Sequence, residues 1–223
     1  MNKPALALMT TAALSMGSTV AMAESSISGD VGADMWFADT KIDEHRRGDA
    51  PAPTFYFSLE HELAYVPDFS FRYTSVDADY AGFDKYDYTF YYKILERELM
   101  TFDAGVMLTQ YTNSHYRTKE SATPIYNFDE TTFNWYAYAE IHVPDTNFDI
   151  IGQFDFSNSS GIKSADVMTG VQYKIGLGNG DLALRGGYRV IDLEFTDLAE
   201  QSPSTNQSFV FVNGFFLGAE YNF

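Results

Sequence analysis

The chain has 223 residues, contains no cysteine, carries a formal net charge of -17, and has 17% aromatic residues. This length predicts a single domain. The missing cysteines exclude disulfides, thiolate metal sites and an acylated N-terminal cysteine. The acidic balance argues against a broad nucleic-acid surface, which needs a basic patch.

Residues 1–23 have the pattern of a cleaved secretory signal peptide. A lysine near the start precedes a mostly apolar run, and residues 21–23 form a small-x-small cleavage site. We therefore expect cleavage between Ala23 and Glu24, which leaves residues 24–223 as one mature domain. The apolar run is too short to cross a membrane as a helix, which needs roughly 20 residues.

The mature chain consists largely of stretches in which apolar or aromatic residues alternate with polar ones. Alternation with a period of two is typical of a β-strand that has one apolar and one polar face. Such strands are predicted at 27–37, 55–63, 69–74, 86–94, 102–109, 133–143, 148–156, 166–175, 182–190 and 209–223.

The connections between these stretches alternate in length. Short turns are predicted near Pro67, Arg97, Pro144 and Asn179, and longer polar loops at 38–53, 76–84, 111–131, 157–164 and 196–207. An even strand number, short periplasmic turns and longer outer loops are the rule for bacterial transmembrane barrels. The predicted fold is therefore all-β, a transmembrane antiparallel up-and-down β-barrel of ten strands with both termini periplasmic. Eight strands remain an alternative if a weak pair does not form.

The last strand, 209–223, places an apolar or aromatic residue at almost every second position and ends on Phe223. This ending resembles the C-terminal signature of bacterial outer-membrane β-barrel proteins, whose final strand ends on an aromatic residue, usually Phe. The resemblance implies a location in the cell outer membrane, among its lipid and lipopolysaccharide, and insertion by the barrel-assembly machinery. Tyr221 and Phe223 would then form the assembly signal. This strand is expected to pair with 27–37, because a barrel that is closed in lipid leaves no free edge.

The outward aromatic residues are expected to form girdles at the two membrane interfaces. The outer girdle is predicted to include Phe133, Trp135, Tyr86, Tyr88, Tyr188 and Phe209.

The polar phase of the strands is expected to face the lumen. It predicts an inward network of charged side chains made of Asp30, Asp34, Glu60, Glu62, Arg72, Asp87, Lys93, Asp103, Glu140, Arg185 and Arg189. Barrels near this size are usually filled by their own side chains. We therefore interpret the network as structural ion pairs; the alternatives are a narrow, acid-lined, cation-preferring pathway and a ligand cavity.

No catalytic, cofactor or metal site is predicted. Ser114 and His115 lie in the longest predicted loop, but adjacent side chains on one strand point apart, and no paired motif of the omptin-type outer-membrane proteases is present. The acidic outer loops lack a Ca²⁺-binding loop with its glycine. The bases Arg46, Arg47, Arg117 and Lys119 are candidate contacts to lipopolysaccharide phosphates.

The leading hypothesis is a structural or surface-interaction barrel that acts through its outer loops on an unidentified ligand. One alternative is a narrow cation-preferring pore for small solutes. The other is an outer-membrane lipid or peptide hydrolase.

Overall fold

The computed structural model describes residues 27–42, 45–117, 125–196 and 208–223, which form a closed antiparallel barrel of ten strands. The strands are β1 (Ser28–Ile42), β2 (His45–Glu60), β3 (Asp68–Asp77), β4 (Ala81–Arg97), β5 (Met100–Tyr116), β6 (Thr131–His142), β7 (Phe148–Ser159), β8 (Ile162–Gly176), β9 (Asp181–Phe195) and β10 (Ser208–Asn222). The all-β, ten-stranded prediction is confirmed, and the eight-stranded alternative is wrong.

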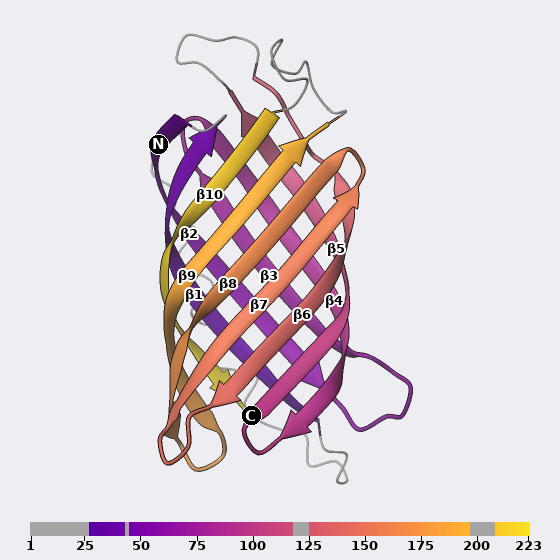
Figure 1. Ribbon diagram of the computed structural model, residues 1–223, viewed down its shortest axis with the longest axis vertical. Coiled ribbons are helices and arrows are strands. Elements are labelled where there is room, and N and C mark those ends of the chain that lie inside the picture. Colours follow the sequence, from indigo (N-terminus) through magenta and orange to yellow (C-terminus); the bar gives the residue numbers. More distant parts are fainter. Residues whose placement is uncertain (1–26, 43–44, 118–124, 197–207) are drawn as a thin grey trace.

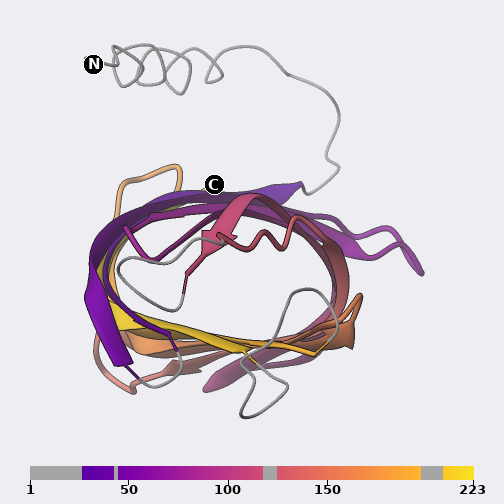
Figure 2. The ribbon, with the colours of Figure 1, turned by 90° about the horizontal axis from the view of Figure 1, so that it is seen from above.

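Every strand pairs with its neighbour in the sequence, and β1 closes the ring by pairing with β10. The β1–β10 register runs from Asp30 opposite Asn222 to Ile42 opposite Val210, so the predicted closure between first and last strands is confirmed. Figures 1 and 2 show the tilted strands from the side and the closed ring from above. Closure leaves each strand with two partners and so removes the edges that lipid could not satisfy. Within the described residues, no helix has the length and apolarity needed to cross a membrane. The predicted signal peptide and its Ala23–Glu24 cleavage site lie outside those residues.

Several strands extend further than predicted at one end of the barrel. This is the end opposite the start of β1 and the end of β10. Most of 38–53, predicted as a loop, belongs to β1 and β2, and 76–84 and 157–164 shrink to turns at 78–80 and 160–161. Part of 111–131 belongs to β5, which runs to Tyr116. The prediction of long loops is wrong at 38–53, 76–84 and 157–164, because the strands continue past the stretch whose outer face is apolar, whereas a long connection between β5 and β6 is confirmed from 117 to 130.

Two prolines in β2, Pro51 and Pro53, contributed to the wrong loop prediction. They pair with Phe37 and Met35 of β1. On the other side, β2 pairs with β3 only from Thr54 to Leu59. The prolines therefore lie where β2 has a neighbour on one side only, which is the position in a sheet that tolerates a residue without an N–H donor.

Two halves of the barrel differ in which face is apolar. We call the half that contains the start of β1 and the end of β10 the termini half, and the other the far half. In the termini half, large apolar side chains cover the outside, for example Leu217 at 63% exposure and Trp135 at 55%. In the far half, the outward positions turn polar; they include Asp39, Lys41, Asp49, Asp77, Asp84, Gln110, Thr131, Asn158, Lys163, Asp192 and Glu194.

The barrel lumen as candidate functional site

A cluster of six charged side chains fills the middle of the lumen. It consists of Arg72, Lys85, Asp87, Asp155, Asp166 and Arg189, which come from β3, β4, β7, β8 and β9. We call it the ion cluster. Three basic and three acidic groups make it formally neutral, and all six residues are buried.

The contacts of the ion cluster cross the lumen. The Arg72 guanidinium donates to Asp155 at 2.7 Å and to Asp87 at 2.9 Å. Lys85 Nζ lies 2.7 Å from Asp87 and 2.9 Å from Asp166, and Arg189 donates to Asp166 at 2.7 Å. Bidentate and shared charge-assisted hydrogen bonds of this kind compensate the cost of burying charge. The ion cluster therefore ties opposite walls together and leaves no charge in it without a partner.

The far half of the lumen is filled by an apolar core. Buried residues at its inward positions include Ile42, Val76, Phe83, Tyr111, Tyr116, Phe128, Ile162, Leu193, Phe195, Val210 and Val212. The ring of Phe195 stacks on Tyr116 with centroids 5.0 Å apart, and Phe128 packs against it at 4.8 Å. This core closes the lumen beyond the ion cluster, in the same way that side chains fill a small soluble barrel.

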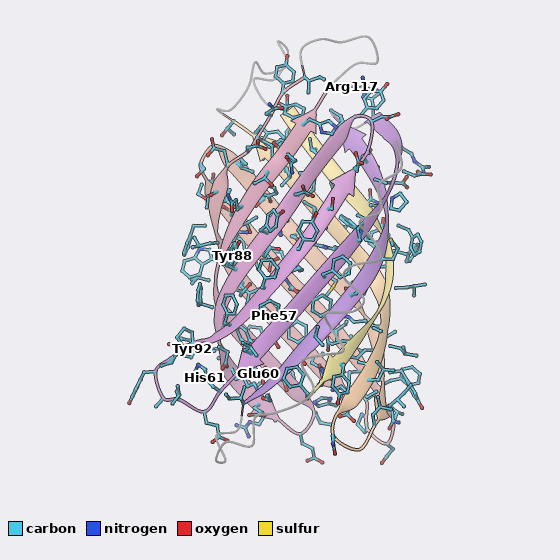
Figure 3. The ribbon with its side chains drawn as sticks, turned by 180° about the vertical axis from the view of Figure 1, so that it is seen from behind. Phe57, Glu60, His61, Tyr88, Tyr92 and Arg117 are labelled. Carbon is cyan, nitrogen blue, oxygen red and sulfur yellow. The ribbon has the colours of Figure 1, made fainter. Side chains whose placement is uncertain are left out.

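Between the ion cluster and the termini end lies a cavity of about 360 Å³. Its wall carries the carboxylates Asp30, Asp34, Glu60, Asp103, Glu140 and Glu220, the bases Lys93, Lys174 and Arg185, and four tyrosines, Tyr56, Tyr91, Tyr136 and Tyr138. Exposed residues at its rim, Glu96 and Asp181, place its mouth at the termini end. In Figure 3, Glu60 lies at this end of the barrel, near the turn that carries His61.

The structure distributes the predicted charged residues over two places. Arg72, Asp87 and Arg189 belong to the ion cluster. Asp30, Asp34, Glu60, Lys93, Asp103, Glu140 and Arg185 line the cavity. Glu62 lies in neither the ion cluster nor the cavity, because β2 ends at Glu60 and Glu62 is exposed in the following turn. Lys85, 1% exposed at the centre of the ion cluster, was missed because it adjoins a stretch predicted as loop.

Ser114 and His115 do not form a catalytic pair. Asn113 has a φ of 51° at a register shift between β4 and β5, and this bulge turns Ser114 inward. Ser114 Oγ donates to Asp129 at 2.6 Å, whereas His115 Nε2 lies 3.2 Å from the carbonyl oxygen of Ala78. The two side chains therefore contact different partners and not each other.

Among the residues that the structure describes, two groups of side chains have metal-ligand geometry, and bases of the chain already contact both. Asp87, Asp155 and Asp166 surround Arg72 and Lys85 in the ion cluster. Glu140, His142 and Asp149 lie beside Lys174, whose Nζ is 2.5 Å from Glu140 and 3.0 Å from Asp149. A bound cation would have to displace these bases.

The predicted girdle residues face outward. Phe133 and Trp135 make an edge-to-face contact at 5.8 Å, and Tyr86 packs against Tyr73 at 5.0 Å. Tyr88 is exposed on the outer face of β4 and is labelled in Figure 3. Tyr188 lies midway along β9 rather than near its end, because that strand runs on to Phe195. Phe209 lies at the far end of β10, and Tyr221 stacks on Phe223 at the other end of the same strand.

Two of the bases that are candidate contacts to lipopolysaccharide phosphates already contact other side chains of the chain. Arg46 lies 2.6 Å from Asp39 and 3.1 Å from Asp49 in the far half. Arg117, labelled in Figure 3, lies over the ring of Tyr80 at 4.7 Å. Lys119 lies outside the described residues.

No protein-family model and no curated protein matches the sequence. Among solved structures, the outer membrane protease OmpT of Escherichia coli is similar at 10% identity and a TM-score of 0.44, covering 92% of this chain and 99% of its own. The β domain of the Bordetella autotransporter BrkA is similar at 12% identity and a TM-score of 0.43, covering 88% and 99%. An outer membrane channel from Pseudomonas putida F1 gives 14% identity and a TM-score of 0.38, covering 92% and 97%. Solved structures this distant from the chain do not indicate its activity.

The class of the protein follows from the barrel itself. A closed ring of ten tilted antiparallel strands, whose termini half has an apolar outer surface and a charged lumen, defines a small outer-membrane β-barrel.

Proposed function

We propose that the protein is a non-conducting outer-membrane barrel with periplasmic termini, whose far half stands outside the membrane and presents a surface at the cell exterior. The observation that carries this proposal is the reversal of faces in the far half. Apolar side chains fill its lumen, and polar and charged side chains occupy many of its outward positions. Such a wall is stable in water and costly in hydrocarbon.

The side chains that fill the lumen favour this function over a pore. A solute would have to pass both the ion cluster, where every base contacts a carboxylate within 3.2 Å, and the far-half core. Separating buried ion pairs costs several kcal/mol per uncompensated charge, about 3 to 5 when one partner is lost. The hydrolase alternative has no support from Ser114, whose hydroxyl is engaged by Asp129.

Conductance tests the closed state. The mature protein, reconstituted in planar bilayers, is expected to give no current steps above an empty-bilayer control, while a porin in the same chamber gives them. Reproducible steps from the wild-type protein would contradict the proposal and favour the cation-preferring pore.

Cysteine labelling tests the orientation, because the natural chain has no cysteine. Asp77→Cys places a thiol at the far end of β3, and Glu98→Cys places one in the turn between β4 and β5 at the other end. Both native side chains are exposed. A membrane-impermeant maleimide added to intact cells should label Asp77→Cys alone and should reach Glu98→Cys after the outer membrane is permeabilised. The reverse order would place the termini outside.

A further inference from the structure

We infer that the cavity of the termini half binds a small organic ammonium ion, held by the carboxylate of Asp103 and the rings of Tyr91 and Tyr136. This site is separate from the surface role proposed above and does not depend on the orientation of the barrel.

The cavity has more acidic groups than its bases neutralise. Each base on its wall contacts a carboxylate: Lys93 with Glu60 at 2.8 Å, Lys174 with Glu140 at 2.5 Å, and Arg185 with Glu220. Arg72 and Arg189, which form the cavity floor, are engaged in the ion cluster. Within the described residues, the side-chain donors to Asp30 are two neutral groups, Ser58 Oγ at 2.6 Å and the Asn222 amide. The surplus negative charge of the wall favours a cationic ligand.

Asp34 and Asp103 each bury one carboxylate oxygen without a hydrogen-bond partner among the described residues, but Asp34 Oδ1 lies 3.8 Å from Arg185 Nε, whereas Asp103 forms no ion pair with a base of the described chain. Asp103 is 6% exposed and lines the cavity, and its oxygen without a partner is Oδ1. Gln172 Oε1, on the same wall, is a further buried acceptor without a hydrogen-bond partner in the described part of the chain. A buried carboxylate without a donor is costly, and a ligand N⁺–H group would remove that cost.

Two aromatic rings lie beside Asp103. Tyr91 of β4 and Tyr136 of β6 both pair with Gly105, and their ring centroids are 5.8 Å apart. Asp103 is the next inward residue of β5, between Lys93 and Tyr138. A Cβ atom on Gly105 would lie 2.1 Å from the carbonyl oxygen of Phe90, so this position has no room for a side chain. Ring faces next to a carboxylate are the usual environment for an ammonium group.

An ammonium ion fits this site better than a metal ion. Ca²⁺ takes six to eight oxygen ligands and Mg²⁺ also needs several. Asp103 is not part of either three-residue group with metal-ligand geometry in the described chain. One carboxylate with two nearby tyrosine rings instead matches a single charged, hydrogen-bonding head group. A volume of about 360 Å³ is in the range of small-molecule sites.

The test is a calorimetric titration of the purified, refolded barrel in detergent with putrescine, a linear diamine. Butanediol serves as its neutral isostere, and Ca²⁺ is titrated separately. We expect saturable binding of putrescine and no heat from butanediol. Asp103→Asn should weaken binding about tenfold or more, since a hydrogen bond to a charged group is lost. Tyr136→Leu should weaken it about threefold.

Asp145→Asn is the matched control. Asp145 is exposed in the turn between β6 and β7 at the same end of the barrel, and its φ of 61° is one that asparagine tolerates. Putrescine affinity should be unchanged in this variant. Asp103→Asn removes an unpaired buried charge, so it should still fold, which heat-dependent gel mobility checks. Equal putrescine affinity in Asp103→Asn and the wild type, saturation by Ca²⁺ with no heat from putrescine, or no binding of either would overturn the inference.

Discussion

The two halves of the barrel share the same strands but have opposite faces. Along β9, the inward residues change from Arg185 and Arg189 in the termini half to Ile191, Leu193 and Phe195 in the far half. The outward residues change from Leu184, Tyr188 and Val190 to Asp192 and Glu194. Side chains continue to alternate between the inside and the outside along the whole strand. In the far half, however, the apolar residues point inward and the charged residues point outward. The placement proposed above explains the exchange, because it puts lipid outside the termini half and water outside the far half.

This comparison also explains how each half is stabilised. The termini half has lipid on its outside, so apolar burial inside is not its main requirement, and its lumen can hold charge. With water outside it, as proposed, the far half must bury apolar side chains within, as a soluble barrel does. The ion cluster lies where the two arrangements meet, and the largest effects of mutation are expected at this junction.

Asp166→Ala should have the largest effect on stability. Asp166 accepts hydrogen bonds from Arg72, Lys85 and Arg189, and its removal leaves three buried bases with two carboxylates. We expect the free energy of unfolding to fall by about 5 kcal/mol, the upper end for breaking a buried ion pair. Urea titration of the barrel in lipid vesicles measures it. A loss below about 1 kcal/mol, as in an exposed pair, would show that water reaches the cluster.

Phe195→Ala should have the next largest effect on stability. Phe195 is fully buried in the far-half core between Tyr116 and Phe128. If this half has a core of the soluble type, the truncation should cost about 3 to 5 kcal/mol through lost burial and the cavity left behind. The control is Phe215→Ala on the outer face of β10, where the ring is 68% exposed and lipid fills the space. Equal losses in the two variants would contradict the distinction between the halves.

Leu217→Arg tests the outside of the termini half. Leu217 projects from β10 with 63% exposure, opposite Met35 of β1 and Gly186 of β9. An arginine facing the middle of the bilayer should cost about 2 to 4 kcal/mol. Asp192→Arg, on the polar outer wall, should cost about 1 kcal/mol or less. Refolding into vesicles over a urea series gives both values. Similar costs at the two positions would mean that the membrane boundary does not lie between them.

The sequence allowed the number of strands, their order and the outward apolar face to be predicted, because lipid imposes a simple period-two pattern. It did not reveal the length of the strands in the far half. There the period continues with charged residues outside, and the charges and prolines of 38–53 suggested a loop. A charged outward position is favourable only where water, and not lipid, surrounds the barrel. The alternation of residues does not say which of the two solvents surrounds a given stretch.

The lumen was predicted less completely for a geometric reason. Period two shows that Arg72 and Asp87 face inward, and their adjacent strands bring them together. It cannot show that Arg72 meets Asp166, which is 94 residues away across the lumen. That contact depends on the tilt and stagger of the closed barrel. The cavity around Asp103 depends on the same geometry and on which carboxylates the neighbouring bases contact.

Lys163→Ala is expected to have the smallest effect, and it tests where the membrane ends. Lys163 and Glu194 lie on the outer wall of the far half, with Nζ 3.0 Å from the carboxylate and the lysine side chain 62% exposed. In water, losing this pair should change stability by about 0.2 to 1 kcal/mol, because solvent takes over both charges. In lipid, the remaining Glu194 would be an uncompensated charge and the loss would be several-fold larger. Urea titration of Lys163→Ala beside the Lys163→Ala, Glu194→Ala double variant separates the two cases. If the double variant restores stability that the single variant has lost, Glu194 faces hydrocarbon, and the polar wall of the far half lies inside the bilayer.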